Sequence, residues 1–226
     1  MGPLPPCVRR YLGAFLDALL PRTCAACRTI VTTPAPVCER CEGALASLPI
    51  PEPLMVAVDG GSTLVVQALF PFAGPARELV HALKYQNRRD VAPALAQLAA
   101  VRFGPELPHA TLVPIPLHPR RERTRGYNQS LVLAAAIAEA TGARLEPVLI
   151  RKRSTRSQTR LGRAARAGNI AGAFALAPRV APSDRSRTVI LVDDVVTTGA
   201  TLGAAAATLS IWAPGSIRAL TAAHEL

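Results

Sequence analysis

The sequence predicts an α/β protein in which a parallel sheet is flanked by helices. Apolar, strand-like segments alternate with alanine-rich helical segments through the C-terminal two-thirds of the chain. The run at residues 189–192 has four apolar β-formers in a row, which is typical of a strand buried on both faces. With 226 residues, the chain can hold one main domain, expected at 51–226, behind a small module at 1–50.

The charge balance favours anionic partners. Lys and Arg number 26 against 15 Asp and Glu, which gives a formal net charge of +11. Such an excess suits phosphates, pyrophosphate or nucleic acid, although a solvated basic surface explains it equally well. The apolar segment 11–20 is interrupted by Asp17 and is too short to span a bilayer. We interpret it as an amphipathic helix and expect a cytoplasmic protein without membrane insertion.

Four cysteines near the N-terminus have the spacing of a zinc site. Cys24 and Cys27 form one CxxC pair, and Cys38 and Cys41 form a second pair after a gap of ten residues. Two such pairs complete a closed tetrahedral site for structural Zn²⁺, as in a zinc ribbon. The alternatives are two redox pairs or unligated thiols. Cys7 is left over and is not expected to take part.

The middle of the chain shows a regular order of elements. A proline-rich linker is expected at 45–61, and His81 is expected to be structural or solvated rather than catalytic. The predicted elements are a strand at 63–70, helices at 76–84 and 91–103, and a strand at 111–116.

A basic loop is predicted after the strand at 111–116. Residues 117–130 carry four arginines before a helix at 130–141: Arg120, Arg121, Arg123 and Arg125, followed by Gly126. In an open α/β sheet, ligands bind at the carboxyl ends of the strands, and guanidinium groups match phosphate oxygens. A solvated basic loop remains an equal alternative.

The next segment has the character of a lid or an arm. After a strand at 145–150, residues 151–166 contain seven cations and no acid. The segment could close over a site or bind nucleic acid, but it has no interleaved aromatic residues for base stacking. The chain then returns to the sheet at 174–177, and the last elements are a helix at 200–212 and a strand at 216–223.

The strand at 189–192 leads into the most informative stretch of the sequence. Asp193 and Asp194 follow the strand, and a loop of small and hydroxyl residues then opens a helix: Thr197, Thr198, Gly199, Ala200 and Thr201. Such a loop lets main-chain N–H groups surround an anion at the positive end of the helix dipole. Because the acidic pair suits vicinal hydroxyls, the stretch predicts a sugar-phosphate ligand.

Several motifs together resemble a known family. VILVDDVVTTGAT resembles the phosphoribosyl-pyrophosphate signature of type I phosphoribosyltransferases. With the four cysteines, KYQNRRD, VPIPLHPRRERTRGYNQS and TRSQTRLGRAARAGNIAGAF, nearly the whole chain resembles the ComF (competence protein F) family.

The resemblance implies a type I phosphoribosyltransferase-like sheet behind an N-terminal zinc ribbon. It implies that Asp193 and Asp194 bond the ribose hydroxyls, that residues 197–201 hold the 5′-phosphate, and that the arginines at 120–125 face pyrophosphate bridged by Mg²⁺. It also implies an association with DNA uptake.

Two functions follow from these features. The first is an enzyme that displaces pyrophosphate from phosphoribosyl pyrophosphate in favour of an acceptor that no motif identifies. The second is a non-catalytic competence factor that binds single-stranded DNA or a partner such as a helicase-like uptake protein. No residue is identified as a general acid or base.

Overall fold

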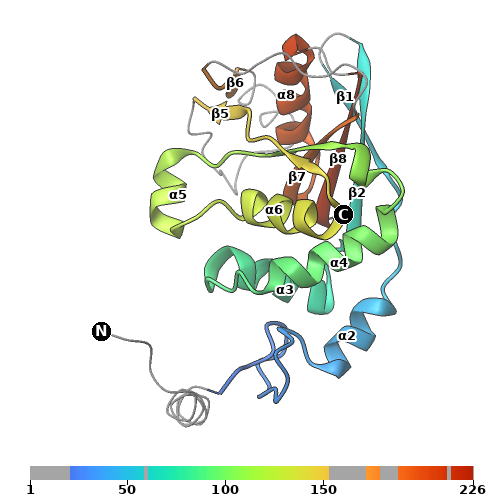
Figure 1. The fold of residues 1–226 in the computed structure, drawn as a ribbon, viewed down its shortest axis with the longest axis vertical. Coiled ribbons are helices and arrows are strands. Elements are labelled where there is room, and N and C mark those ends of the chain that lie inside the picture. The colour runs from blue at the N-terminus through green and yellow to red at the C-terminus, as the bar shows by residue number, and fades with distance from the viewer. Residues whose placement is uncertain (1–20, 59–60, 153–171, 179–187, 213–214, 226) are drawn as a thin grey trace.

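The computed structural model describes residues 21–58, 61–152, 172–178, 188–212 and 215–225 (Figure 1). Its main sheet has six strands in the order β1-β2-β8-β7-β3-β4. Only the β1–β2 pair is antiparallel. The strands are β1 (Leu54–Val58), β2 (Ser62–Pro71), β3 (Thr111–Pro114), β4 (Arg144–Leu145), β7 (Thr188–Val196) and β8 (Ser216–His224). The predicted α/β class with a mostly parallel sheet is confirmed.

Helices cover both faces of this sheet, as predicted. On one face lie α3 (Gly74–Tyr85), α4 (Val91–Phe103) and α6 (Gln129–Thr141), and on the other lies α8 (Ala200–Leu209) (Figure 1). The side chains of β7 alternate between the two layers, because successive strand residues point to opposite faces. Ile190 and Val192 pack in the cluster under α4 and α6, whereas Val189 and Leu191 pack with α8. Burial on both faces explains the unbroken apolar run.

The N-terminal cysteine segment packs onto the same core as α3. It has one isolated bridge, between Thr23 and Ile30, and a helix, α2 (Glu39–Ala46). Cys24, Cys41 and Leu45 are buried in the hydrophobic cluster that also contains core residues of α3 and α4. Within the described residues, the segment is therefore two knuckles and a helix rather than a ladder of ribbon strands. Residues 1–20, including the predicted amphipathic helix, lie outside the described residues.

The predicted strand at 145–150 was wrong, because the segment is divided between two sheets. β4 ends at Leu145, and β5 (Leu149–Arg151) pairs instead with β6 (Phe174–Leu176) in a separate antiparallel ribbon. Pro147 lies between them and has no N–H to donate to a ladder, which favours a break at this point. The predicted return to the main sheet at 174–177 is wrong for the same reason.

The basic stretch after β3 is a short helix and not the predicted loop. α5 (Pro119–Arg125) begins with proline at its first position, and the His118 imidazole accepts a hydrogen bond from the Arg120 N–H at 3.2 Å. Gly126 ends the helix with φ +85°, a conformation that suits glycine. The N-terminal proline and C-terminal glycine were visible in the sequence as helix signals.

Two smaller differences concern strands. β1 lies inside the segment predicted as a linker, and β7 continues past the two aspartates to Val196. The predicted helix at 91–103 is confirmed residue for residue, and the predictions for β2, α3 and α6 are within two residues at each end. Short 3₁₀ turns at Leu107–His109 and Ser210–Trp212 complete the described elements. None of the described helices has the length and apolarity needed to cross a membrane.

Candidate functional site

The two aspartates lie in the last third of β7, at the carboxyl end of the parallel strands. β7 is flanked by β3 and β8, so this position is central in the sheet. Asp194 pairs with no strand residue in the β7–β8 register, while Asp193 lies opposite Thr221. Helices α3 and α6, which cover the same face of the sheet, supply the side chains that contact the two carboxylates.

Asp194 is a buried carboxylate with one ionic partner among the described residues. Its side chain faces the same side of the sheet as Val192, and the residue is 4% exposed. The Lys84 ammonium at the end of α3 lies 2.9 Å from Asp194 Oδ1. Asp194 Oδ2 is buried and has no hydrogen-bond partner in the part of the chain that the structure describes. Burying a carboxylate oxygen without a donor is costly, so this oxygen can accept a donor from a ligand.

Asp193 has a different environment, with two neutral donors on one oxygen. The Ser130 hydroxyl donates to Asp193 Oδ1 at 2.8 Å, and the Asp194 N–H donates to the same oxygen at 2.9 Å. Burial, followed by the neighbouring Asp194 charge, raises the pKa of Asp193 to about 7, while Ser130 and Lys84 act in the opposite direction. Asp193 can therefore gain or lose a proton near neutral pH.

The loop after β7 turns sharply into α8 at Gly199. Gly199 has φ +75° and caps α8, and its Cα lies so close to β1 that a Cβ would be 2.3 Å from Val56 Cγ2. Within the described residues, no group accepts a hydrogen bond from the main-chain N–H of Gly199, Ala200 or Thr201. The first N–H groups of a helix are free for an external acceptor, and the helix dipole favours an anion there. The predicted loop 197–201 thus has the geometry of an anion cradle.

The four predicted arginines divide into two environments on α5. Arg120 and Arg123 are exposed, while Arg121 and Arg125 are partly buried. Arg125 Nη1 donates to Gln129 Oε1 at 2.5 Å, and its guanidinium lies 5.2 Å from the Tyr85 ring centroid. Arg125 therefore belongs to the surface beside α3 rather than to the carboxylate pair.

Arg121 is linked to the carboxylates through Arg151, a residue that sequence reasoning did not select as a ligand-binding residue. Burial, and then repulsion from Arg121, lower the pKa of the Arg151 guanidinium, and the Asp193 charge raises it. Arg151 lies at the end of β5 and its guanidinium covers the Phe174 ring at 5.3 Å. The electrostatic interactions thus run from Arg121 on α5 to Arg151 on β5, and from Arg151 to Asp193. Most of the predicted lid, at 153–166, lies outside the described residues.

The turn between α5 and α6 fixes Ser130 in place. The Asn128 amide donates to the Ile115 carbonyl at 3.0 Å, and its oxygen accepts from the Ser130 N–H at 3.0 Å. The Tyr127 hydroxyl donates to the Leu83 carbonyl of α3. The contacts tie α6 to β3 and α3, so that Ser130 and the α3 C-terminus approach β7 together.

Sequence reasoning missed Lys84 and Ser130 as contacts of the aspartates. Both occur in segments that carry the family resemblance, KYQNRRD and VPIPLHPRRERTRGYNQS, but neither has a spacing that relates it to Asp193. Both residues are far from the aspartates in the sequence, and only the order of the strands in the sheet brings them together.

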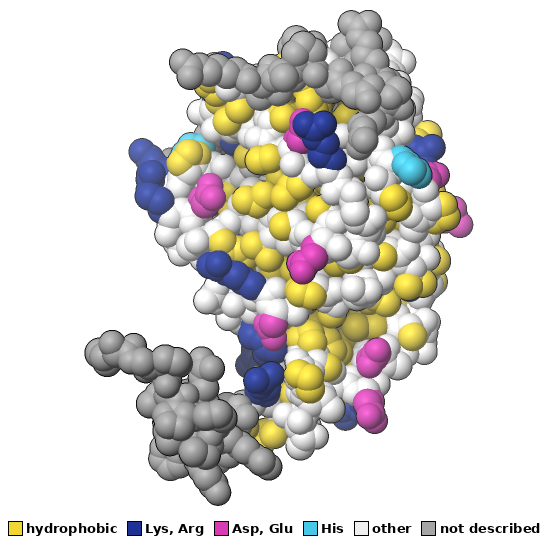
Figure 2. Space-filling model, in the orientation of Figure 1, with side chains coloured by type: hydrophobic (Ala, Val, Ile, Leu, Met, Phe, Trp, Pro, Cys, Tyr) yellow, Lys and Arg dark blue, Asp and Glu magenta, His cyan; other side chains and the backbone are white. Residues whose placement is uncertain are grey.

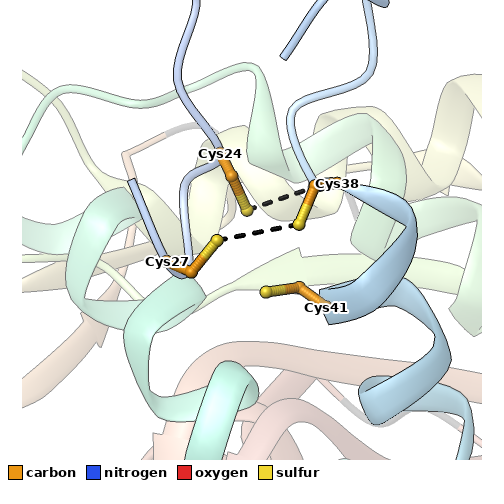
Figure 3. A group of neighbouring side chains, drawn as sticks. All are labelled: Cys24, Cys27, Cys38 and Cys41. Carbon is orange, nitrogen blue, oxygen red and sulfur yellow. Dashed lines mark hydrogen bonds between the residues drawn. The ribbon is translucent and has the colours of Figure 1, made fainter. Parts of the chain in front are cut away.

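The four predicted metal ligands converge on one point (Figure 3). Their sulfur atoms all lie within 4.8 Å of one another, and Cys27 Sγ and Cys38 Sγ are 3.6 Å apart. A tetrahedral Zn²⁺ site with Zn–S bonds of about 2.3 Å places its sulfurs about 3.8 Å apart. The thiols are unpaired by disulfides, so the cluster can hold a metal ion such as zinc after a small contraction.

The cysteine thiols differ in acidity. Hydrogen bonding to Thr29, first through its side chain and then through its main chain, lowers the pKa of Cys27 to about 5. Burial raises the pKa of Cys41 to about 12. Metal binding would therefore release a proton from Cys41, because only the thiolate is a good ligand.

Comparisons with known proteins give a consistent set of relatives. The chain is 32% identical to the DNA utilization protein YhgH of Salmonella typhimurium over 207 residues, which cover 84% of this chain and 88% of that protein. It is 33% identical to the protein of the same name from Escherichia coli K12 over 139 residues, 58% and 59% of the two chains. Competence protein F of Haemophilus influenzae is 35% identical over 137 residues, 57% and 58% of the two chains. No family model matches the chain.

Proposed function

The chain belongs to the ComF (competence protein F) family, and on this premise we propose that it binds phosphoribosyl pyrophosphate with Mg²⁺ beside β7. The proposal rests on one arrangement: two adjacent carboxylates beside a helix N-terminus whose first N–H groups have no acceptor among the described residues. A carboxylate pair accepts hydrogen bonds from vicinal hydroxyls, and a helix N-terminus binds phosphate. A ribose 5-phosphate carries vicinal hydroxyls, which the carboxylates would bind, and a phosphate, which the start of α8 would bind.

The ligand would lie across the carboxyl edge of the sheet. Asp193 and Asp194 would accept hydrogen bonds from the ribose hydroxyls, and the loop 197–201 would hold the 5′-phosphate. Arg151 would face the pyrophosphate together with Arg121, because the pKa of Arg151 responds both to the Asp193 charge and to the Arg121 charge. Mg²⁺, which prefers oxygen ligands, would bridge the pyrophosphate and add positive charge beside it.

The reaction that this site would support is displacement of pyrophosphate. An electron pair of the acceptor forms a bond to the anomeric carbon, while the bond from that carbon to pyrophosphate breaks and its electron pair leaves with the pyrophosphate. As the bond to pyrophosphate breaks, cation-like charge would develop on the ribose, where the two carboxylates would stabilise it. Negative charge would grow on the pyrophosphate, where the arginines would stabilise it.

Thermal unfolding tests the binding proposal. At 100 times the dissociation constant, phosphoribosyl pyrophosphate with Mg²⁺ should stabilise the protein by about 2.7 kcal/mol, a rise in Tm of about 5–10 °C. Asp193→Asn combined with Asp194→Asn should abolish the rise, and Glu139→Gln, an exposed charge change on α6, should preserve it. An equal rise in the double variant would remove the ribose assignment. Release of pyrophosphate in a screen of bases and amines would establish turnover.

We propose further that the four-cysteine cluster holds Zn²⁺ in a structural role. All four ligand positions are filled by protein sulfurs, so no position is open for a substrate. Zinc would displace the thiol protons and bind the thiolates, and it would stabilise the attachment of α2 to the core.

A second candidate function, binding of single-stranded DNA, is favoured by an exposed aromatic surface. Tyr85 is 66% exposed, with the Arg125 guanidinium on its ring and the His81 ring centroid 4.8 Å away. The names of the relatives point to DNA utilization and competence. By contrast, basic and acidic side chains are interspersed on the face in Figure 2, which shows no continuous basic patch among the described residues.

Fluorescence anisotropy with a labelled oligothymidylate tests this candidate. Tyr85→Ala should weaken binding about 5- to 150-fold if one base stacks there, and Tyr85→Phe should not. Equal affinities of the two variants would exclude stacking at this surface.

A further inference from the structure

We infer that Lys84 is a positioning residue: its ammonium holds the buried Asp194 carboxylate in one orientation, so that the carboxylate pair presents its oxygens to a ribose in one fixed geometry. The inference rests on the proposed binding of phosphoribosyl pyrophosphate. It assigns to α3, which carries no part of the loop 197–201, a role in ligand affinity.

The burial of Asp194 makes an ionic partner necessary. A carboxylate that is 4% exposed loses most of its hydration, and a cation within hydrogen-bonding distance compensates for that loss. Among the described residues, the only ion pair made by either aspartate is the 2.9 Å contact to Lys84. Without Lys84, the buried carboxylate would lose its ionic partner and rotate toward another donor.

The two aspartates differ in the charge of their hydrogen-bonding partners, and the lysine contacts Asp194. Among the described residues, the donors to Asp193 Oδ1 are both neutral: the Ser130 hydroxyl and the Asp194 N–H. The charged groups that act on it are Asp194, Lys84 and Arg151, with Arg121 behind Arg151. Lys84 is therefore the cation that directly contacts the pair, and it contacts the more buried member.

Lys84 is also held more firmly than an ordinary surface lysine. It lies in the last turn of α3, and its side chain is 20% exposed. The preceding residue, Leu83, is fully buried, and its carbonyl accepts the Tyr127 hydroxyl from the α5–α6 turn. The helix is thus anchored at the residue before the lysine, and the lysine's ammonium lies beside β7.

Titration calorimetry with phosphoribosyl pyrophosphate and Mg²⁺, from pH 6 to pH 9, tests the role. Lys84→Met should raise the dissociation constant at pH 7.5 at least about tenfold, since loss of one partner strands a buried charge. It should also move the pH midpoint of binding about one unit upward, because the pair then releases its proton less readily. Lys84→Arg should restore both values, and Arg77→Met, an exposed cation lost from the same helix, should change neither.

The outcomes separate the inference from the function on which it rests. Absence of binding by the wild-type protein at every pH would remove the proposed function. Wild-type binding with an unchanged dissociation constant and pH midpoint in Lys84→Met would overturn the role of Lys84. If Lys84→Met fails to fold, Lys84→Gln replaces it, because glutamine keeps an apolar stem and a donor. Wild-type values in Lys84→Gln would likewise overturn the role.

Discussion

Replacing Gly199 with alanine should destabilise the protein and distort the loop 197–201. Gly199 is the residue through which β7 turns into α8, with φ +75°. The alanine Cβ would meet Val56 Cγ2 at 2.3 Å and Val56 Cγ1 at 3.3 Å, both well inside normal contact distances. Val56 is a buried residue of β1, so its methyl groups can move only by displacing the packing between β1 and α8.

The expected loss in the free energy of unfolding has two parts, one from the backbone conformation of Gly199 and one from its contact with Val56. A non-glycine residue in the left-handed region costs about 1–2 kcal/mol. Forcing an extra methyl group into a packed core costs a further 1–3 kcal/mol or so. Gly199→Ala should therefore lower the free energy of unfolding by about 2–5 kcal/mol.

Gly142 is a matched control for the backbone part. It has φ +77°, but a Cβ there would meet nothing within 4 Å, so Gly142→Ala should cost only the backbone part, about 1–2 kcal/mol. Urea unfolding should show the larger loss in Gly199→Ala, and Val56→Ala in that background should cost less than Val56→Ala in the wild type. Equal losses at the two glycines, with additive effects of Val56→Ala, would refute the proposed contact between β1 and the loop 197–201.

Three other perturbations have defined outcomes. The pKa of Asp193 is raised from 3.8 to about 7, so its ionisation lowers the free energy of unfolding as the pH rises through that range. Asp193→Asn should therefore raise the free energy of unfolding by on the order of 4 kcal/mol at most above pH 7, and should leave it unchanged below about pH 4. Urea unfolding at several pH values measures this, and a gain independent of pH would contradict it. Metal analysis should give about one zinc per chain, and Cys41→Ser should lower both zinc content and Tm, whereas metal-free protein of full stability would argue against the site. Arg88→Met should cost about 1–2 kcal/mol, because the guanidinium donates to the Thr23 carbonyl at 2.9 Å and joins the cysteine segment to α3; an unchanged Tm would show that this contact is unimportant.

The hydrophobic pattern of the sequence predicted those elements that are continuous in the chain and belong to one sheet or one helical layer. The apolar run in β7 and the helical spacing of α4 needed no tertiary information, and both predictions are confirmed. The division of 145–151 between two sheets was different, because the apolar residues on either side of Pro147 look like one strand until the sheet order is known. β1 was missed because prolines precede it directly, although as an antiparallel edge strand it tolerates such neighbours.

The candidate site was predictable only for the residues on consecutive segments. Asp193, Asp194 and the loop 197–201 follow one strand, so their proximity is a local property. Lys84 and Ser130 reach the same place from α3 and α6, and only the order of the strands brings those helix ends to β7. The cysteine cluster was predictable because each CxxC pair is local and the gap between the pairs is short.

Calorimetric titration of the wild-type protein and of the Asp193→Asn, Asp194→Asn double variant is the most direct test of the account. The ligand is phosphoribosyl pyrophosphate in the presence of Mg²⁺. We predict one ligand bound per wild-type chain, and no measurable heat of binding in a double variant that melts cooperatively without ligand. Binding of equal affinity to both proteins, or no binding to the wild type, would contradict the claim that the carboxyl end of β7 is a ribose-phosphate site.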